Sequence, residues 1–281
     1  MLFKPVELSF ISARRWSGEK NFQRDYKFIC GVPYERTESF RGGASLAPSE
    51  IREFSHSLES YSIILGKDLE EIKLFDIGDL DVSELEPEDM IWEVEEAISS
   101  LLPAFPLVLG GEHTISLGVI RALANHYPEL YVISLDAHPD FRSFYEGRKL
   151  SHATVLKRIS EVVGKKNIFL LGIRTSTPEE WEELKGLNKV SPEPIDLPLS
   201  LRDKPIYLSL DIDVLDPSCA PGTGNPEPGG WSFKELQDFL LSLRGFKVVG
   251  MDIVEVSPPL DPSGITIVAA AKIAREALLL F

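Results

Sequence analysis

Cysteine is scarce in this sequence: the 281 residues include two, Cys30 and Cys219, which lie far apart in the chain. Two cysteines do not form a disulfide framework, so we expect the protein to fold in a reducing compartment. The lack of further thiolates also argues against a structural zinc site, because such sites are built largely from cysteine.

Long apolar runs are lacking too. Residues 1–16 contain no uninterrupted apolar segment of the kind that a signal peptide needs. The apolar segment at 265–280 is interrupted by Lys272, Arg275 and Glu276, which favours a packed helix over a membrane span. We therefore expect a cytoplasmic protein that makes no contact with a membrane.

Positive charge is in deficit, with 29 Lys and Arg residues against 44 Asp and Glu residues and a formal net charge of -15 at pH 7. This balance disfavours nucleic acid or an anionic membrane as a partner. It is compatible with a small cationic substrate. The hydrophobic content of 43% and the charged content of 26% are ordinary for a globular protein.

Short apolar runs alternate with stretches of helical periodicity along the chain. We predict strands at residues 26–31, 72–75, 107–109, 131–135, 168–173, 206–210 and 247–253, and leave an eighth, within 190–197, open. We predict helices at residues 48–58, 91–101, 117–124, 155–162, 178–184, 232–240 and 265–280. The alternation favours one parallel sheet with helices on both faces. No repeat, low-complexity tract or convincing linker divides the chain, so we predict a single domain over residues 1–281.

Three of the predicted strands end in side chains of the metal-ligating type. One such segment alone would be read as a polar loop, but the pattern occurs three times, and in open parallel sheets ligands bind at the carboxyl ends of strands. After 131–135 the ligand types occupy every second position, which places them on one side of an extended chain. The candidate ligands are His113, Asp136, His138, Asp140, Asp211 and Asp213.

The repulsion between these carboxylates favours a metal site over an empty acidic cleft. Two carboxylates about 4 Å apart repel by roughly 4 kcal/mol at an effective dielectric constant of about 20. Four crowded carboxylates cannot all ionise at neutral pH without cations among them. Aspartates with a few imidazoles suit Mn, Mg, Fe or Zn. The pattern therefore predicts a pair of metal ions whose identity ligand chemistry alone leaves open.

The same segments resemble the motifs of the ureohydrolases, the family of arginase and agmatinase. The resemblance extends over nearly the whole chain from about Lys27 and rests on Gly31-Val-Pro-Tyr34, Asp76-Ile-Gly-Asp79, Gly110-Gly-Glu-His113, Asp136-Ala-His-Pro-Asp140, Ser209-Leu-Asp-Ile-Asp-Val-Leu-Asp-Pro217, residues 220–230 and Glu255-Val-Ser-Pro258. It implies the arginase-type fold, a three-layer α/β/α sandwich around a mostly parallel sheet of about eight strands.

The resemblance also implies how two metal ions would be held, and that both are Mn²⁺. One ion would be bound by His113, Asp136, Asp140 and Asp211. The other would be bound by Asp136, His138, Asp211 and Asp213. Asp136 and Asp211 would then bridge the two ions, which together would provide a hydroxide to attack a guanidinium carbon.

Three side chains are assigned to catalysis by this resemblance. Asp140 would contact the tetrahedral intermediate, Glu255 would pair with the guanidinium nitrogens, and His152 would carry a proton to the departing amine. Without the resemblance, His152 reads as a helix cap or core residue and Glu255 as half of an ordinary salt bridge. The implied reaction converts agmatine and water to putrescine and urea.

Two positions bear on the substrate. Arg142 stands where arginases carry an asparagine, and its surroundings resemble agmatinases of the archaeal and Gram-positive type. Asn225 replaces the threonine that is usual in the Gly-Thr-Gly-Thr-Pro-Glu-Pro-Gly-Gly motif.

Other substrates would make the protein an arginase, a guanidino-acid hydrolase or a formimidoylglutamase. A metal-dependent deacetylase and a non-catalytic amine-binding relative are further alternatives. Relatives assemble as trimers or hexamers, so we expect a homo-oligomer.

Overall fold

The computed structural model describes residues 3–16, 18 and 22–281, so six residues of the expected domain 1–281 lie outside the described part. Its main sheet consists of β1 (Phe3–Lys4), β2 (Arg14–Arg15), β3 (Tyr26–Val32), β6 (Lys73–Leu80), β7 (Phe105–Gly110), β8 (Tyr131–Leu135), β9 (Ile168–Leu171), β10 (Lys189–Ser191), β11 (Ile206–Asp211) and β12 (Val248–Val254). A separate hairpin is formed by β4 (Tyr61–Ser62) and β5 (Lys67–Asp68).

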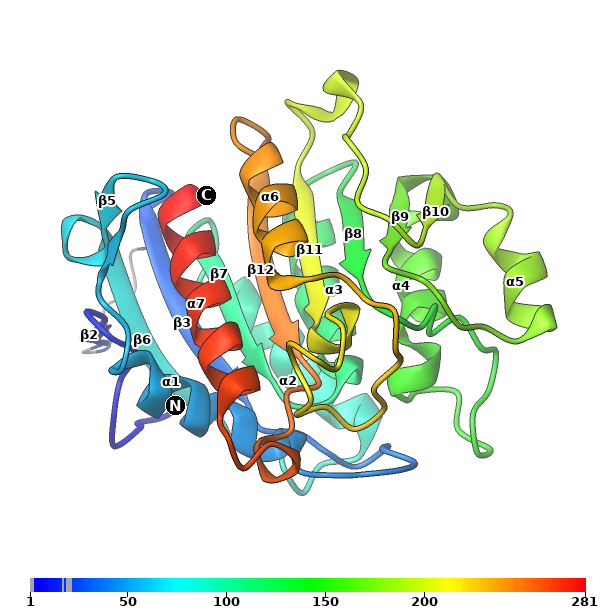
Figure 1. Cartoon of the computed structure of the whole chain (residues 1–281), viewed down its shortest axis with the longest axis horizontal. Coiled ribbons are helices and arrows are strands. Elements are labelled where there is room, and N and C mark those ends of the chain that lie inside the picture. The colour runs from blue at the N-terminus through cyan, green and yellow to red at the C-terminus, as the bar shows by residue number, and fades with distance from the viewer. Residues whose placement is uncertain (1–2, 17, 19–21) are drawn as a thin grey trace.

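The sheet is parallel except at one edge. The strand order is β1-β6-β3-β7-β12-β11-β8-β9-β10, with β2 also paired to β6 (Figure 1). Among the described strands of this sheet, β1 and β6 form the antiparallel pair. The predicted fold class is therefore confirmed, and the described part of the chain forms a main sheet of ten strands rather than about eight. The additional strands β1 and β2 are two residues long each, too short for a periodic pattern.

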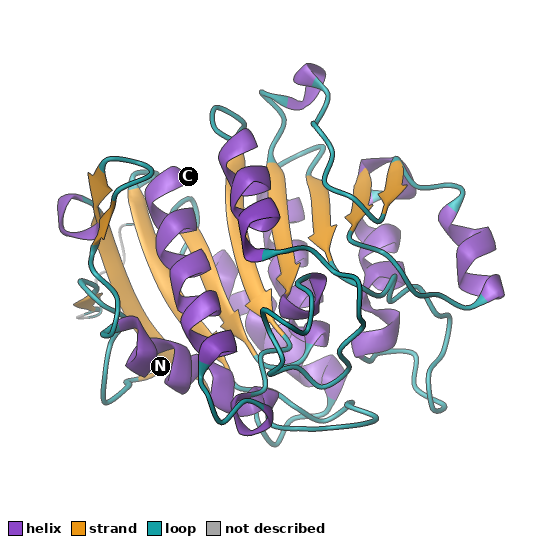
Figure 2. Ribbon diagram, viewed as in Figure 1, coloured by secondary structure: helices purple, strands orange, loops and turns teal. Residues whose placement is uncertain are grey.

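Helices cover both faces of the sheet. The helices are α1 (Ala47–Ser55), α2 (Pro87–Ser99), α3 (Ser116–His126), α4 (Val155–Val163), α5 (Pro178–Leu184), α6 (Phe233–Ser242) and α7 (Ile265–Leu280). In the view of Figure 2, α1, α6 and α7 lie in front of the sheet and α2, α3 and α4 lie behind it. None of the helices described is both long and apolar enough to cross a membrane.

Two apolar cores follow from the alternation of side chains along each strand. In β8, Ile133 and Leu135 belong to the core shared with α7, while Val132 belongs to the core shared with α3. Successive side chains of a strand point to opposite faces of the sheet, so a strand covered on both faces is apolar throughout. This explains why the central strands were recognisable as continuous apolar runs.

The strand predicted at 72–75 continues as β6 to Leu80, through the acids Asp76 and Asp79. Arg52 of α1, which is 1% exposed, donates from Nε to Asp76 Oδ2 at 2.8 Å and from Nη1 to Asp79 Oδ1 at 2.6 Å. Because a buried carboxylate is tolerated when it is paired and hydrogen-bonded, these contacts allow the strand to continue. The acids are part of a buried ion-pair network between α1 and β6.

The topology places four strand ends next to one another. β7, β12, β11 and β8 are consecutive neighbours, and all three pairs are parallel. Their carboxyl ends therefore meet at one edge of the sheet, in its middle. Every candidate ligand, together with Glu255, follows one of these four strands or ends it.

Candidate metal centre and active site

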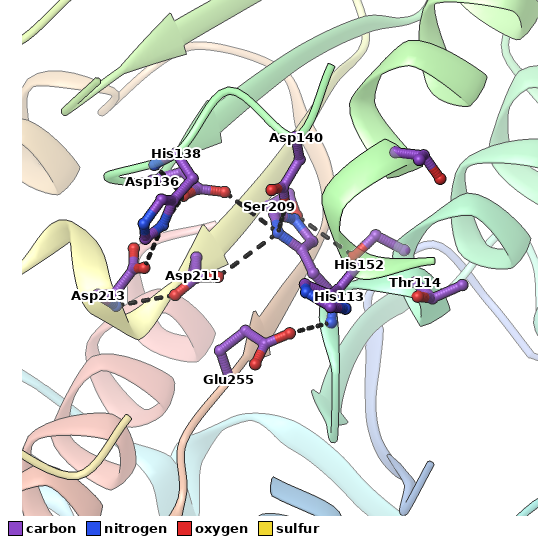
Figure 3. A network of polar contacts seen from close by, with 12 residues as sticks. His113, Thr114, Asp136, His138, Asp140, His152, Ser209, Asp211, Asp213 and Glu255 are labelled. Carbon is purple, nitrogen blue, oxygen red and sulfur yellow. Dashed lines mark hydrogen bonds and ion pairs between the residues drawn. The ribbon is translucent and has the colours of Figure 1, made fainter. Parts of the chain in front are cut away.

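The candidate ligands converge at this edge of the sheet (Figure 3). His113 Nδ1 lies 3.2 Å from Asp136 Oδ2, 3.2 Å from Asp140 Oδ2 and 3.5 Å from Asp211 Oδ2. All four residues are buried. Ligand atoms of His113, Asp136 and Asp140 are close enough together to hold one ion.

A second group lies beside the first and shares Asp136 with it. His138 Nδ1 is 2.8 Å from Asp213 Oδ2 and 3.7 Å from Asp136 Oδ1. Ligand atoms of Asp136, His138 and Asp213 lie close enough together to hold an ion. The structure thus brings together all six ligands that the sequence indicated, in two groups joined by one carboxylate.

The carboxylates of this cluster are buried close together, and their negative charges repel one another. Burial, and then the charges of Asp140 and Asp213, raise the pKa of Asp136 to about 7. Burial likewise raises the pKa of Asp211 well above its usual range, with Asp213 and Asp136 adding to the effect. Burial lowers the pKa of His138, but the neighbouring Asp213 outweighs it and the pKa rises to about 10. These shifts show that the buried carboxylates repel one another, and a bound cation would relieve that repulsion.

Two buried atoms show that the residues fit a metal. His113 Nδ1 and Asp136 Oδ2 lie 3.2 Å apart, yet neither atom makes a hydrogen bond to the described residues, although both are buried. Buried polar atoms are normally hydrogen-bonded, and carboxylate and imidazole donors suit divalent cations of hard to borderline character. The donor set and the unpartnered atoms both fit a divalent ion at this place.

The Nε2 side of the His113 ring is fixed by a hydrogen bond to Ser209. Ser209 Oγ donates to Asp252 Oδ1 at 2.7 Å, and Tyr207 donates its hydroxyl proton to Asp252 Oδ2 at 2.7 Å. Because the proton of Ser209 is used in this way, its oxygen accepts from His113 Nε2 at 3.0 Å. Nδ1 is thereby the ring nitrogen available as a ligand, an arrangement typical of metal-binding histidines.

Two candidate residues adopt a left-handed backbone, which non-glycine residues rarely do. The φ angle is 47° at Asp140 and 62° at Glu255. Such conformations cost of order 1–3 kcal/mol and cluster at functional sites.

Glu255 lies beside the turn that carries His113. Its Oε1 accepts the backbone N–H of His113 at 2.6 Å, and its own N–H donates to the carbonyl of Gly111 at 2.9 Å. A β-carbon at Gly111 would lie 2.0 Å from the carbonyl oxygen of Tyr34, so glycine is required there. Burial, followed by the charges of Asp211 and Glu38, raises the pKa of Glu255 well above its usual range.

A cavity of about 220 Å³ opens over the cluster, and Asp140, His152 and Glu255 line it. His152 follows Ser151, which forms a capping box with Thr154. The ring of His152 stands edge-on to Tyr145, with 5.5 Å between the ring centroids. The three side chains that the sequence assigned to catalysis therefore share one cavity.

Arg142 and Asn225 also line this cavity. Arg142 Nε lies 3.4 Å from Glu180 Oε2, and its guanidinium lies 4.8 Å from the ring centroid of Tyr145. Arg142 is thus engaged with a neighbouring acid and an aromatic ring. Asn225 Nδ2 lies 3.0 Å from Nε2 of His138, the ring nitrogen that faces away from Asp213.

Sequence reasoning missed the residues that hold these side chains in place. Arg174, just beyond β9, donates from Nη2 to the carbonyls of Asp213 and Glu227, each at 2.6 Å. It thereby joins the turn after β11 to the loop at 217–230. These two partners lie 39 and 53 residues away from Arg174 in the sequence, so no local sequence pattern could have predicted this role.

The comparisons with known proteins agree with this geometry. A family model described as the arginase family matches residues 27–280. The chain belongs to the arginase family. An agmatinase of Bacillus anthracis is 42% identical over 270 residues, covering 92% of this chain and 93% of the relative.

Solved structures of the arginase-fold type are also similar. The agmatine ureohydrolase of Thermoplasma volcanium superposes on this arginase-family chain with a TM-score of 0.81 and 33% identity, covering 91% of this chain and 89% of that chain. The proclavaminate amidino hydrolase of Streptomyces clavuligerus gives a TM-score of 0.86 and 29% identity, covering 100% of this chain and 98% of that chain.

Proposed function

We propose that this protein is a binuclear-metal amidinohydrolase that converts agmatine and water to putrescine and urea. The observation that carries the proposal is the pair of His/Asp groups joined by Asp136. They lie in a cavity that Glu255 and His152 also line. The 42% identity to an agmatinase over most of the chain supports agmatine as the substrate.

The metal ligands in this proposal are those that the sequence indicated. One ion would be held by His113, Asp136, Asp140 and Asp211. The other would be held by Asp136, His138, Asp211 and Asp213. We propose Mn²⁺ in both positions, because the resemblance to ureohydrolases implies it. When bound, such a pair of ions lowers the pKa of a water molecule enough to supply hydroxide near neutral pH.

The protein's own side chains bind and orient the substrate. The carboxylate of Glu255 receives the guanidinium nitrogens in charge-assisted hydrogen bonds. Asp140, whose Oδ2 lies 3.2 Å from His113 Nδ1 in the first ligand group, contacts the reacting carbon's substituents. His152 on the cavity wall gives a proton to the departing amine, which leaves as a neutral molecule only after it has been protonated.

The lining of the cavity favours a cationic tail over a carboxylate. Arg142 is the one Lys or Arg among the described residues that line it, and it already contacts Glu180. An α-carboxylate would therefore have to compete with Glu180 for the guanidinium of Arg142. A mispaired polar group costs about 1–3 kcal/mol, which corresponds to roughly ten- to two-hundred-fold in specificity.

The decisive experiment compares four substrates on one metal-loaded sample. Urea or amide release would be measured for agmatine, arginine, 4-guanidinobutyrate and formimidoylglutamate, first with the wild type and then with Arg142→Ala. We expect agmatine to have the highest kcat/KM in both proteins. Arg148→Ala is the matched control, because Arg148 lies in the same loop and donates to the carbonyl of Arg36 at 3.3 Å.

Two outcomes would contradict the proposal. If an acid substrate is preferred and loses its advantage in Arg142→Ala alone, Arg142 is a carboxylate receptor and the enzyme is not an agmatinase. If verified metal-loaded protein hydrolyses none of the four, the amidinohydrolase assignment is wrong and a deacetylase or a non-catalytic binding protein takes its place.

A further inference from the structure

Behind His152 lies a buried hydroxyl group that the mechanism has not used. Thr37, in the loop after β3, is 5% exposed. Its Oγ1 lies 2.6 Å from Glu112 Oε1, 3.0 Å from the backbone nitrogen of His152 and 3.3 Å from His152 Nδ1. Thr114 Oγ1 is more distant, at 3.4 Å.

The direction of each hydrogen bond follows from counting protons. A threonine hydroxyl has one proton to donate and two lone pairs that accept. Glu112 also accepts the backbone N–H groups of Arg36 at 2.8 Å and of Thr37 at 2.7 Å, so it acts as an acceptor throughout. The hydroxyl proton of Thr37 therefore goes to Glu112, along the shortest of the contacts.

This leaves Thr37 Oγ1 as an acceptor towards His152. Its two lone pairs receive the backbone N–H of His152 and the proton on Nδ1. Nε2 is then the ring nitrogen left for the cavity, which His152 lines. A histidine whose Nδ1 proton is held in this way presents one defined nitrogen for proton exchange.

We propose that Thr37, oriented by Glu112, is a positioning residue that fixes the tautomer and ring orientation of His152. The proposal rests on the proposed function insofar as His152 transfers the proton to the departing amine. Glu112 precedes His113 in the chain, so the same carboxylate links the position of His152 to that of the first metal group. The loop after β3 is thereby part of the active site, although it supplies no metal ligand.

The first test locates the hydrogen atoms directly. Neutron diffraction from crystals of the full-length, metal-loaded protein should show a deuteron on Nδ1 of His152 pointing at Thr37. It should also show the hydroxyl deuteron of Thr37 pointing at Glu112. A hydroxyl deuteron directed at His152 Nδ1 would overturn the proposal. This reading does not depend on the substrate, so it stands or falls separately from the agmatinase assignment.

The second test is kinetic and uses Thr37→Val and Thr37→Ser, with Thr114→Val as the matched control. General acid–base groups contribute roughly 10²- to 10⁴-fold, so we expect Thr37→Val to lower kcat for agmatine by about 10- to 100-fold. KM should change less than about twofold, because the substrate contacts remain. Thr37→Ser keeps the hydroxyl and should restore most of the rate. Thr114→Val removes a neighbouring buried hydroxyl and should leave kcat near that of the wild type.

A double-mutant cycle separates positioning from general loss of structure. In a His152→Asn background, Thr37→Val should have little further effect on kcat, because the group that it positions is gone. If Thr37→Val lowers kcat by the same factor in both backgrounds, or leaves it unchanged in the wild type, the proposal is wrong. Circular dichroism and metal content confirm that each variant is folded and loaded, and Thr37→Ala replaces Thr37→Val if the latter does not fold.

Discussion

Glu255 has a structural contact and a cavity-facing position at the same time. Its Oε1 accepts the N–H of His113, while the side chain lines the cavity. A carboxylate that only stabilised the turn could be replaced by an amide at little cost, because the amide oxygen accepts the same N–H. The two contributions can therefore be separated by one substitution.

The first prediction concerns Glu255→Gln. The variant keeps the acceptor for the N–H of His113, so its stability and metal content should stay near those of the wild type. It loses the negative charge that would meet the guanidinium, and by analogy with broken buried ion pairs the loss in kcat/KM should reach about 3–5 kcal/mol. Steady-state kinetics with agmatine and elemental analysis of the purified variant provide the measurement. Unchanged catalytic efficiency would show that Glu255 does not bind the guanidinium.

At the scale of elements, the loop at 217–230 depends on residues outside it. Asp216 Oδ2 accepts the N–H of Gly229 at 2.8 Å, and hydrogen bonds from Ser218 and Gly229 lower the pKa of Asp216 to about 2. Arg174 reaches the loop at Glu227 from the end of β9. Since Asn225 of this loop contacts His138, the loop couples the edge of the sheet to the second metal group.

The second prediction is that Arg174→Lys loosens this loop. A lysine presents one ammonium where the planar guanidinium reaches several carbonyl groups. We expect faster hydrogen exchange in residues 223–230 and metal binding at the second group weakened by about 10- to 100-fold, as outer contacts of a metal site typically allow. Hydrogen–deuterium exchange and calorimetric metal titration measure both effects.

Arg202→Lys is the control for this experiment. Arg202 also donates to a backbone carbonyl, that of Gly245, at 3.1 Å, but it lies ahead of β11 rather than beyond its carboxyl end. It should change neither exchange in the loop nor metal affinity. Wild-type exchange and metal affinity in Arg174→Lys would show that the loop is held by other contacts.

The contrast between ligands and supporting residues explains what could be predicted from the sequence. Asp136 and Asp211 were recognisable because each follows a continuous apolar strand and belongs to a period-two pattern of ligands. Thr37 was not, since its partners Glu112 and His152 lie 75 and 115 positions away and a lone threonine in a loop has no pattern. Contacts that exist only after folding leave no periodic signal.

Three predicted elements have the boundaries that the structure shows. The strand at 131–135 and the helices at 178–184 and 265–280 agree with β8, α5 and α7. β6 was too short in the prediction because Asp76 and Asp79 look like the end of a strand. Only the tertiary contact with Arg52 makes these acids compatible with its interior.

For the whole molecule, the third prediction concerns removal of metal. A chelator should abolish urea release, and Mn²⁺ should restore it best. The free energy of unfolding should also fall on chelation, because a ligand at 100 times its Kd stabilises the folded state by about 2.7 kcal/mol. His138→Ala should lose metal from the second group, whereas His56→Ala should not, since His56 is exposed and contacts the carbonyl of Ser9. Elemental analysis and thermal unfolding are the measurements. Full activity in verified metal-free protein would contradict the mechanism.

The fourth prediction is that the chain forms a homo-oligomer, a trimer or a hexamer, as the resemblance to ureohydrolases implies. Light scattering at micromolar concentration measures the mass. A value near the monomer mass of 31.4 kDa would contradict the prediction.

The order of strands in the sheet has a consequence for protein synthesis. The ribosome makes β7 and β8 well before β11 and β12, yet the last two lie between the first two in the finished sheet. In the finished sheet β7 and β8 lie three strand spacings, roughly 14 Å, apart. Until β11 and β12 are inserted between them, β7 and β8 have unpaired apolar edges, which are prone to aggregation. The six ligands cannot come together before residue 213 has left the ribosome and β12 has been inserted between β7 and β11. Uptake of a metal pair by a nascent chain would therefore mark a nearly completed translation product.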